Sequence, residues 1–276
     1  MRMTAAGRSA EYVATTPAPA QRAYRLIAGI DRWPLLFAPC LHVERLGPGT
    51  DGGDRFRMWV ASGDDVREWT SSRHADEQAL RVTFRQERPS APLSAAEGTW
   101  HFEPDADGTR ITLTNAYTLT TADEATATFL ARALERHNAD EVAAVRYWAE
   151  RPEDLDDLLF SLTQEILLDL PADTVHDLLC RGAGPRVRLP GRRLVLDGGP
   201  AVPAPLRAHT ATWSVTADGA RTRVLVRHDA ALDPDAAALG GGPARARATA
   251  EEQLRRSSLQ ILESAGAHAV DRVAAR

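Results

Sequence analysis

The chain of 276 residues contains no lysine, because all 33 of its basic residues are arginines. Without lysine the protein cannot form a Schiff base, use a lysine as a base or hold a nucleotide in a lysine-containing phosphate loop. Cysteine is almost as scarce. Cys40 and Cys180 are the two that occur, and they show no spacing typical of a disulfide framework or a zinc cluster.

Long apolar runs are missing as well. No stretch has the length of a membrane-spanning helix and the N-terminus shows no apolar signal segment, so we expect a cytoplasmic protein with no membrane partner. The net charge of −5 does not favour binding to nucleic acid. With 43% hydrophobic and 26% charged residues, the composition is that of a globular protein long enough for one large or two modest domains.

One stretch of sequence occurs twice. Ala91-Pro92-Leu93 leads to Trp100, and Ala204-Pro205-Leu206 leads to Trp213 with the same spacing, at an offset of 113 residues. Upstream, the similar apolar segments that begin at Pro19 and Pro171 are offset by 152 residues, so the second copy is 39 residues shorter. A strand with its turn takes roughly 8–12 residues, and the difference therefore corresponds to about three strands.

Hydrophobic periodicity and turn residues predict the elements of each copy. In the first copy we expect a strand, a short helix, six further strands and a long helix: residues 11–16, 20–28, 41–46, 54–61, 65–74, 79–87, 97–104, 109–118 and 124–150. In the second copy we expect a strand, a helix, three strands and a long helix: residues 160–170, 172–180, 186–196, 207–217, 220–230 and 249–273.

These orders predict an α+β fold with two tandem helix-grip domains, in which a curved antiparallel sheet surrounds a long C-terminal helix. The first domain, residues 1–152, is expected to be complete and to enclose a pocket for a small molecule. The second domain, residues 153–276, is expected to lack several strands from the middle of its sheet and to have no closed cavity. It would brace the first domain or bind a partner.

The segment from residue 67 to residue 73 is the sharpest candidate for chemistry. Side chains alternate between the two faces of a strand, so Trp69, Ser71 and Arg73 share one face. A permanently cationic arginine beside a hydroxyl and an aromatic ring could stabilise negative charge on a carbonyl or enolate oxygen. The same pattern also fits a solvated strand face with one exposed aromatic residue.

His137 is a further candidate. It lies on the apolar stripe of the predicted helix at residues 124–150, so we expect it to face the sheet. It would then be either a packed, hydrogen-bonded histidine or an acid/base group in the pocket. The histidines and cysteines show no ligand spacing, and we expect no metal and no other cofactor.

Several motifs in the first copy share their order and spacing with one known family. They are Trp33-Pro34 with Phe37, residues 69–73 (WTSSR), residues 84–86 (FRQ), and Ala91-Pro92-Leu93 leading to Trp100. In these motifs residues 9–150 resemble the bacterial polyketide aromatase/cyclases, which are START-like, Bet v 1-like helix-grip proteins. The tandem arrangement is similar to the di-domain members of that family.

The resemblance implies an enzyme that directs first-ring aldol cyclisation and dehydration, and hence aromatisation, of a poly-β-ketone. The substrate would be linked by phosphopantetheine to an acyl carrier protein, with other synthase subunits as partners. Arg73 and Ser71 would be the catalytic residues. The substrate-binding residues would be Trp33, Phe37, Cys40, Trp69, Arg85, Gln86, Trp100 and His137. Which of Arg85 and Gln86 points inward is left open.

Cys40 departs from the family pattern, because single-domain relatives have a tyrosine at this position. A proton donor that those relatives use is then missing, and Cys40 would serve as a thiol of ordinary reactivity or as part of the core.

Two functions of other classes also fit the sequence. Helix-grip folds often act as plain binding proteins, so a non-catalytic carrier of lipids or polyketides would have the same pocket. The shortened second copy favours an assembly protein within a synthase complex. A hydrolase is not indicated, since no nucleophile elbow or zinc motif occurs.

Overall fold

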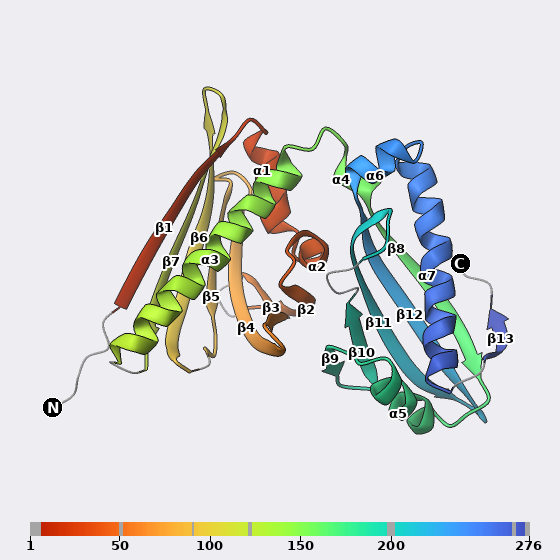
Figure 1. The fold of residues 1–276 in the computed structure, drawn as a ribbon. Helices are drawn as coiled ribbons and strands as arrows, with labels where there is room; N and C mark the ends of the chain where they lie inside the picture. Colours follow the sequence, from red (N-terminus) through yellow and green to blue (C-terminus); the bar gives the residue numbers. More distant parts are fainter. Residues whose placement is uncertain are drawn as a thin grey trace. The chain divides into compact units, whose positions relative to one another are not determined.

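The computed structural model describes residues 7–49, 52–89, 91–120, 123–197, 202–266 and 269–273. The chain divides into two compact units, Met1–Pro152 and Glu153–Arg276, which are coloured red to green and green to blue in Figure 1. Each unit combines one antiparallel sheet with a long helix, which confirms the α+β helix-grip architecture.

The first domain contains a seven-stranded sheet with the order β1-β7-β6-β5-β4-β3-β2. Its strands are β1 (Gly7–Thr16), β2 (Cys40–Pro48), β3 (Asp54–Ser62), β4 (Asp65–Asp76), β5 (Arg81–Gln86), β6 (Leu93–Asp105) and β7 (Gly108–Leu119). Its helical segments are α1 (Ala20–Ala28), the 3₁₀ turn η1 (Ile30–Arg32), α2 (Trp33–Leu36) and α3 (Glu124–Ala149). The long helix begins at the N-cap Asp123, whose carboxylate accepts a hydrogen bond from the Thr126 amide at 2.8 Å.

The two faces of this sheet differ in polarity. Alternate residues of β6 and β7 are buried, among them Trp100, Phe102 and Leu113, and they form what we call the inner face. Helix α1 covers part of this face, where the Tyr24 ring meets Phe102 edge-on at a centroid distance of 6.3 Å. The opposite, outer face is rich in hydroxyl-bearing and charged side chains.

The second domain contains a six-stranded sheet with the order β13-β8-β12-β11-β10-β9. Its strands are β8 (Leu159–Leu168), β9 (Val187–Leu189), β10 (Arg193–Asp197), β11 (Leu206–Asp218), β12 (Arg221–Leu232) and β13 (Ala269–Val273). Its helices are α4 (Leu155–Leu158), α5 (Ala172–Gly182), α6 (Pro234–Leu239) and α7 (Pro243–Ser264).

The helix predicted over residues 249–273 begins and ends earlier than expected, and the strand predicted over residues 186–196 is two strands, β9 and β10. Helix α7 ends at Ser264, and the chain continues as β13, which pairs with β8. Gly266 has a φ of 87°, a conformation that glycine adopts without steric cost and that commonly terminates a helix.

The internal repeat is visible in matching contacts. Trp100 and Trp213 occupy the same position in β6 and β11, and both are buried. The Thr109 hydroxyl at the start of β7 donates to the carbonyl of Ala18, just before α1, at 2.6 Å. In the second domain the Thr222 hydroxyl donates to the carbonyl of Leu170, just before α5, at 2.5 Å. The two copies therefore fix the start of their first helix in the same way.

The shortened second copy has a smaller sheet, but the missing strands are not from its middle as predicted. Between α5 and β10 the described chain forms only the three-residue strand β9, where the first domain has β2, β3 and β4. In the first domain β2 and β3 lie at one edge of the sheet, because the chain crosses to that edge after α1 and returns strand by strand. Removing this stretch shortens the edge and leaves the centre intact.

Candidate functional site

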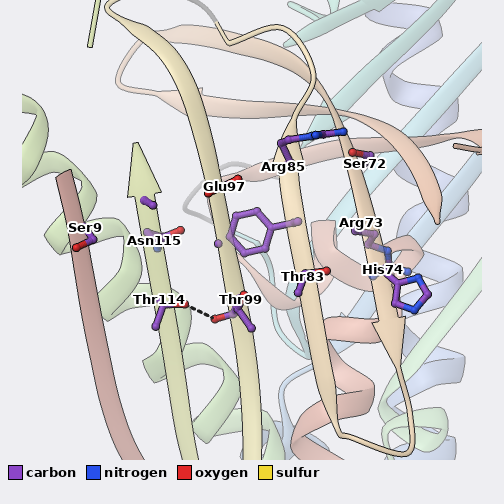
Figure 2. A pocket seen from close by; sticks show the side chains of 13 residues that line it. Ser9, Ser72, Arg73, His74, Thr83, Arg85, Glu97, Thr99, Thr114 and Asn115 are labelled. Carbon is purple, nitrogen blue, oxygen red and sulfur yellow. Dashed lines mark hydrogen bonds between the residues drawn. The ribbon is translucent and has the colours of Figure 1, made fainter. Parts of the chain in front are cut away.

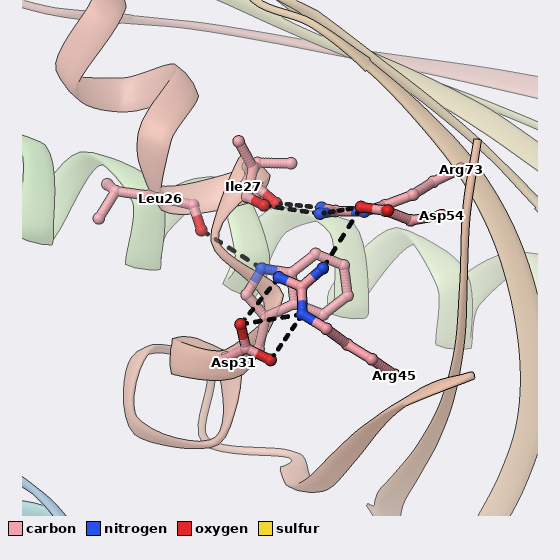
Figure 3. A network of polar contacts seen from close by, with 8 residues as sticks. Leu26, Ile27, Asp31, Arg45, Asp54 and Arg73 are labelled. Carbon is pink, nitrogen blue, oxygen red and sulfur yellow. Dashed lines mark hydrogen bonds and ion pairs between the residues drawn. The ribbon is translucent and has the colours of Figure 1, made fainter. Parts of the chain in front are cut away.

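Arg73 lies on β4 with its side chain only 3% exposed. Its guanidinium donates from Nη1 to the Ile27 carbonyl at 3.0 Å and from Nη2 to the Ala28 carbonyl at 2.7 Å (Figure 3). Nη2 also contacts the Asp54 carboxylate at 3.2 Å. Ile27 and Ala28 end α1, where backbone carbonyls lack partners within the helix. Arg73 is therefore held between the inner face of the sheet and the C-terminal end of α1.

One N–H group of Arg73 is not used by these contacts. Nε is buried and has no hydrogen-bond partner within the described residues. A buried donor without a partner costs roughly 1–3 kcal/mol. A carbonyl or enolate oxygen placed at Nε would remove this cost and would meet a cation that is already fixed in position.

Charged side chains link Arg73 to the surface. Asp54 also pairs with Arg45 at 3.4 Å, and Arg45 pairs with Asp31 at 2.8 Å (Figure 3). Burial lowers the pKa of Arg73, while the hydrogen bond and the charge of Asp54 raise it. Arginine stays protonated under such conditions, so the site keeps its positive charge.

Two aromatic rings lie beside the guanidinium, and a third packs against one of them. Arg73 Cζ lies 6.0 Å from the centroid of Trp33 and 5.9 Å from that of Phe56. The Trp33 ring meets Phe56 at 5.5 Å and Phe37 at 6.1 Å, both nearly perpendicular. The sequence predicted Trp33 and Phe37 but missed Phe56, although the alternation along its strand could have indicated an inward position.

Strand register places the other predicted residues. Ser71 is 3% exposed and pairs with Phe56 on one side and with Gln86 on the other, so all three lie on the inner face with Arg73. Trp69 shares this face, two residues before Ser71 along β4. Trp100 is buried there and stacks on Phe102 at 6.0 Å.

Arg85 is separated from this group. It pairs with Ser72 in the register of β4 and β5, and therefore lies on the outer face. The structure thus distinguishes Gln86, which shares the face of Ser71, from Arg85, which does not.

Helix α3 presents a different residue from the one expected. The His137 side chain is 38% exposed and pairs with Glu141 at 3.3 Å. The neighbouring Asn138 is 2% exposed, and its Nδ2 is buried without a partner in the described residues. The sequence therefore predicted the buried face of α3 one residue out of position. A helix turns by 100° per residue, and this part of α3 has few strongly apolar side chains that would define its buried face.

Glu141, which is partly exposed, and Cys40, which is buried, are further titratable groups of the first domain. Burial raises the pKa of Glu141, and the charge of His137 partly offsets this. Cys40 is 5% exposed, and burial, with a contribution from the charge of Glu141, raises the pKa of its thiol far above the ordinary range. The thiol therefore stays protonated and is not a nucleophile.

A pocket of about 410 Å³ lies on the outer face of the sheet (Figure 2). Side chains that line it include Ser72, His74, Thr83, Arg85 and Thr99. Arg73 borders the same pocket, although its guanidinium is bound on the inner face. A second pocket, of about 660 Å³, shares Ser72 and Arg85 with the first and extends to Gln86.

The second domain contains a buried chain of polar groups. His209 Nε2 lies 2.9 Å from His228 Nδ1, and His228 Nε2 lies 2.9 Å from Ser258 Oγ, which is also 3.3 Å from the Leu254 carbonyl. Burial lowers the pKa of His209 to about 4 and that of His228 to about 3. Both imidazoles are neutral at pH 7, and each can donate to the next group in the chain.

Residues 7–49, 52–89, 91–120, 123–197, 202–266 and 269–273 contain no group of three His, Cys, Asp or Glu side chains that could hold a metal ion. In the same part of the chain no helix combines the length and the apolar character that crossing a membrane requires.

The first domain thus consists of a curved antiparallel sheet, a long C-terminal helix and a buried arginine fixed beneath the short first helix, which together define a helix-grip domain. Residues 16–143 match the sequence model of the family described as "Polyketide cyclase / dehydrase and lipid transport". This domain therefore belongs to the polyketide cyclase/dehydrase family, which confirms the resemblance noted in the sequence.

Two curated proteins with similar sequences come from Streptomyces. The chain is 40% identical over 183 residues to the actinorhodin polyketide synthase bifunctional cyclase/dehydratase of Streptomyces coelicolor. The matching region covers 65% of this chain and 56% of that protein. It is 35% identical over 160 residues to the granaticin polyketide synthase bifunctional cyclase/dehydratase of Streptomyces violaceoruber. This match covers 57% of this chain and 49% of that protein. The chain spans about half the length of the curated relatives it matches.

Solved structures agree with the two-domain fold. The di-domain ARO/CYC BexL from the BE-7585A biosynthetic pathway has a TM-score of 0.70 and 27% identity, over 94% of this chain and 97% of that one. The di-domain ARO/CYC StfQ from the steffimycin biosynthetic pathway has a TM-score of 0.65 and 24% identity, over 93% of this chain and 96% of that one. At this identity the similarity supports the fold alone.

Proposed function

We propose that this protein is a polyketide aromatase/cyclase. It directs the aldol cyclisation of the first ring of a poly-β-ketone and the dehydration that makes this ring aromatic, while the substrate remains linked to an acyl carrier protein. The observation that supports this best is the buried guanidinium of Arg73, with its unpartnered Nε–H on the inner face of a domain of the polyketide cyclase/dehydrase family.

The chemistry needs positioning more than it needs a strong base. A methylene between two carbonyls is already acidic, so the main task is to hold one folded arrangement of a flexible chain against its entropy. Trp33, Phe37 and Trp69 provide rigid apolar surface for such a chain. Arg73 Nε would donate to the carbonyl that accepts the new carbon–carbon bond and would stabilise the negative charge that forms on its oxygen.

Proton transfer then completes the ring. Ser71 lies two residues from Arg73 on the same strand face, so its hydroxyl would donate to or relay a proton for the oxygen of the new alcohol. Loss of this hydroxyl as water follows, because removing a proton from the adjacent carbon gives a conjugated ring. The buried amide of Asn138 and the inner-face amide of Gln86 would bind further carbonyls along the chain.

The test is the product profile of a minimal polyketide synthase with and without this protein. We expect first-ring aromatic product with the wild-type protein and with Arg81→Ala, which changes an exposed arginine on the outer face of β5. Arg73→Ala should remove this product. Because Arg73 also contacts α1, circular dichroism and thermal unfolding must show that the variant is folded. Wild-type product from folded Arg73→Ala would refute the assignment.

A second candidate is a non-catalytic carrier of lipids or polyketides, since the description of the matching family includes lipid transport. A carrier would bind the poly-β-ketone but leave its product distribution unchanged. An assembly protein would change the yield of the synthase without depending on Arg73. The same product assay, with the Arg73→Ala variant, separates all three functions.

A further inference from the structure

We propose that Asn115 binds a second carbonyl group of the substrate and thereby determines which carbon atoms of the poly-β-ketone join in the first ring. This inference rests on the proposed function for the identity of the substrate. Asn115 lies on β7, and the chemistry at Arg73 and Ser71 does not use it.

One row of residues crosses the inner face of the sheet from Arg73 to Asn115. In the strand register Arg73 pairs with Phe84, Phe84 pairs with Gly98, and Gly98 pairs with Asn115. Figure 2 labels the two ends of this row, Arg73 on β4 and Asn115 on β7. Three strand spacings separate these ends, which is roughly 14 Å along the sheet. A chain that lies along the row would meet a hydrogen-bond donor at each end.

Gly98 allows the side chains of its two neighbours in the row to meet above β6. A Cβ atom at this position would lie 2.4 Å from Phe84 Cζ and 2.6 Å from Asn115 Oδ1. Both side chains therefore extend over the glycine, one from β5 and one from β7, and a larger residue would displace them. A glycine inside a strand often marks such a close approach. The ring of Phe84 and the amide of Asn115 thus lie side by side.

The amide of Asn115 is not used by the fold. Asn115 is partly exposed, and its side chain makes no hydrogen bond within the described residues. Asparagine is disfavoured inside strands, and its amide carries two donor hydrogens and an acceptor oxygen. Its neighbours on the same face of β7, Leu113 and Tyr117, are buried. Neither strand propensity nor packing explains an amide between them, whereas a substrate carbonyl would accept a hydrogen bond from its N–H group.

The second domain provides an internal comparison. At the offset of 113 residues that relates the two copies, His228 stands at the position of Asn115, and Ala211, its partner in the register, stands at that of Gly98. His228 is hydrogen-bonded to Ser258 of the long helix α7 at 2.9 Å. The polar group at this position is therefore bound by the long helix in the second domain. In the first domain no described residue of α3 binds Asn115.

Selection of one ring requires two fixed contacts. Every second carbon of a poly-β-ketone carries a carbonyl group, so a single contact at Arg73 leaves several ring closures available. With one carbonyl at Arg73 Nε and another at Asn115, the separation of the two donors sets the number of carbon atoms between them. The chain is then held in one bend, and the entropy of the other bends is lost on binding instead of during the reaction.

The first measurement is binding without turnover. Linear diketones with three to eight methylene groups between the carbonyls, and monoketones of equal length, are titrated against the full chain. Quenching of tryptophan fluorescence reports binding, because Trp69 and Trp100 lie on the same face as Asn115. We expect one diketone to bind about threefold to tenfold more tightly than its monoketone, as for one neutral hydrogen bond.

Matched variants assign this difference to the amide. Asn115→Leu has a side chain of similar size without hydrogen-bonding groups, so it should remove the advantage of the diketone and leave binding of the monoketone unchanged. Thr112→Val, on the outer face of the same strand, should match the wild type. Thermal unfolding should show Asn115→Leu to be at least as stable as the wild type, because no hydrogen bond of the fold is lost.

The second measurement is the position of the ring in the product of the minimal synthase. Asn115→Leu should still form aromatic product but with a mixture of ring positions, where the wild type and Thr112→Val give one. A residue with only a structural role would lower the yield and the stability together without changing the position of the ring.

The inference is overturned if no diketone exceeds its monoketone in the wild type, or if Asn115→Leu keeps the advantage. It is also overturned if Asn115→Leu loses the advantage but gives the ring position of the wild type, because the contact would then not select the ring. Cyclised product with an unaltered ring position in Asn115→Leu would refute this inference and leave the proposed function standing. A wild-type protein that leaves the product of the synthase unchanged would refute the proposed function and with it the selection of a ring.

Discussion

Arg73 illustrates how one buried residue combines structural and chemical roles. Its terminal nitrogens bind the end of α1 and Asp54, and these contacts fix the orientation of the guanidinium. The remaining Nε–H then has a defined direction before any substrate arrives. A donor that is already oriented needs no reorganisation when charge develops, which is the reason that such groups accelerate reactions.

The side chain of Ser71 should contribute less to turnover than that of Arg73. We expect Ser71→Ala to lower turnover by up to about tenfold, as for the loss of one neutral hydrogen bond, and Arg73→Ala by about 100-fold or more. Steady-state kinetics of both variants on the same carrier-bound substrate would test this order. If Ser71→Ala is the more damaging change, the hydroxyl is the principal proton relay and the two roles are reversed.

Cys40 should have no chemical role. Its thiol is buried and its raised pKa keeps it protonated, so Cys40→Ala should leave turnover within about twofold of the wild type. The same change removes a buried side chain and should lower the stability by about 1 kcal/mol. Kinetics and urea unfolding of Cys40→Ala provide the check. A large loss of turnover without a loss of stability would contradict the assignment to the core.

At the scale of elements, the buried histidines of the second domain connect its sheet to α7. Their pKa values lie below the ordinary value of about 6.5, so below that pH the unfolded chain binds more protons than the folded one. The contribution of the two histidines to the free energy of unfolding is therefore complete above about pH 6.5. It decreases as the pH falls, until the pH is below their pKa values in the folded state. Arg255 lowers the pKa of His228 further, and Asp229 opposes the shift of His209.

Urea unfolding of the second domain should show this dependence. We expect its free energy of unfolding to fall by up to about 2 kcal/mol for each imidazole between pH 7.5 and 5. His228→Asn should make the dependence on pH shallower. His74→Asn, which changes an exposed histidine of the first domain, serves as the control. If the free energy of unfolding of His228→Asn depends on pH as steeply as that of the wild type, the two buried histidines do not determine the acid sensitivity of this domain.

At the scale of the whole molecule, the residues proposed for chemistry all lie in the first unit. Arg73, its backbone acceptors on α1 and its aromatic neighbours belong to Met1–Pro152. We therefore expect a fragment of residues 1–152 to retain turnover within a few-fold of the full chain, measured per folded molecule. Circular dichroism would establish the folded fraction. A folded but inactive fragment would mean that the second domain supplies a residue or a partner contact that the reaction needs.

The sequence by itself determined the repeat and most of the main elements, although it did not predict α2, α4, α6 or β13. The strand and helix periods, the turn glycines and the doubled Ala-Pro-Leu segment follow from local physical preferences, so the long helix at residues 124–150 and the strand that contains Trp69, Ser71 and Arg73 were predicted almost to the residue. Turn and capping preferences did not fix the end of α7, where a single glycine conformation ends the helix and a strand follows.

The tertiary structure decided which of these residues meet. Pairing between β3, β4 and β5 placed Phe56 and Gln86 beside Ser71 and moved Arg85 to the outer face, and helix packing buried Asn138 in place of His137. Such contacts join residues that are distant in the chain, and a shift of one residue in register reverses the face of a side chain. For that reason the pattern of one strand or helix indicates which residues can share a site, whereas the folded sheet selects those that do.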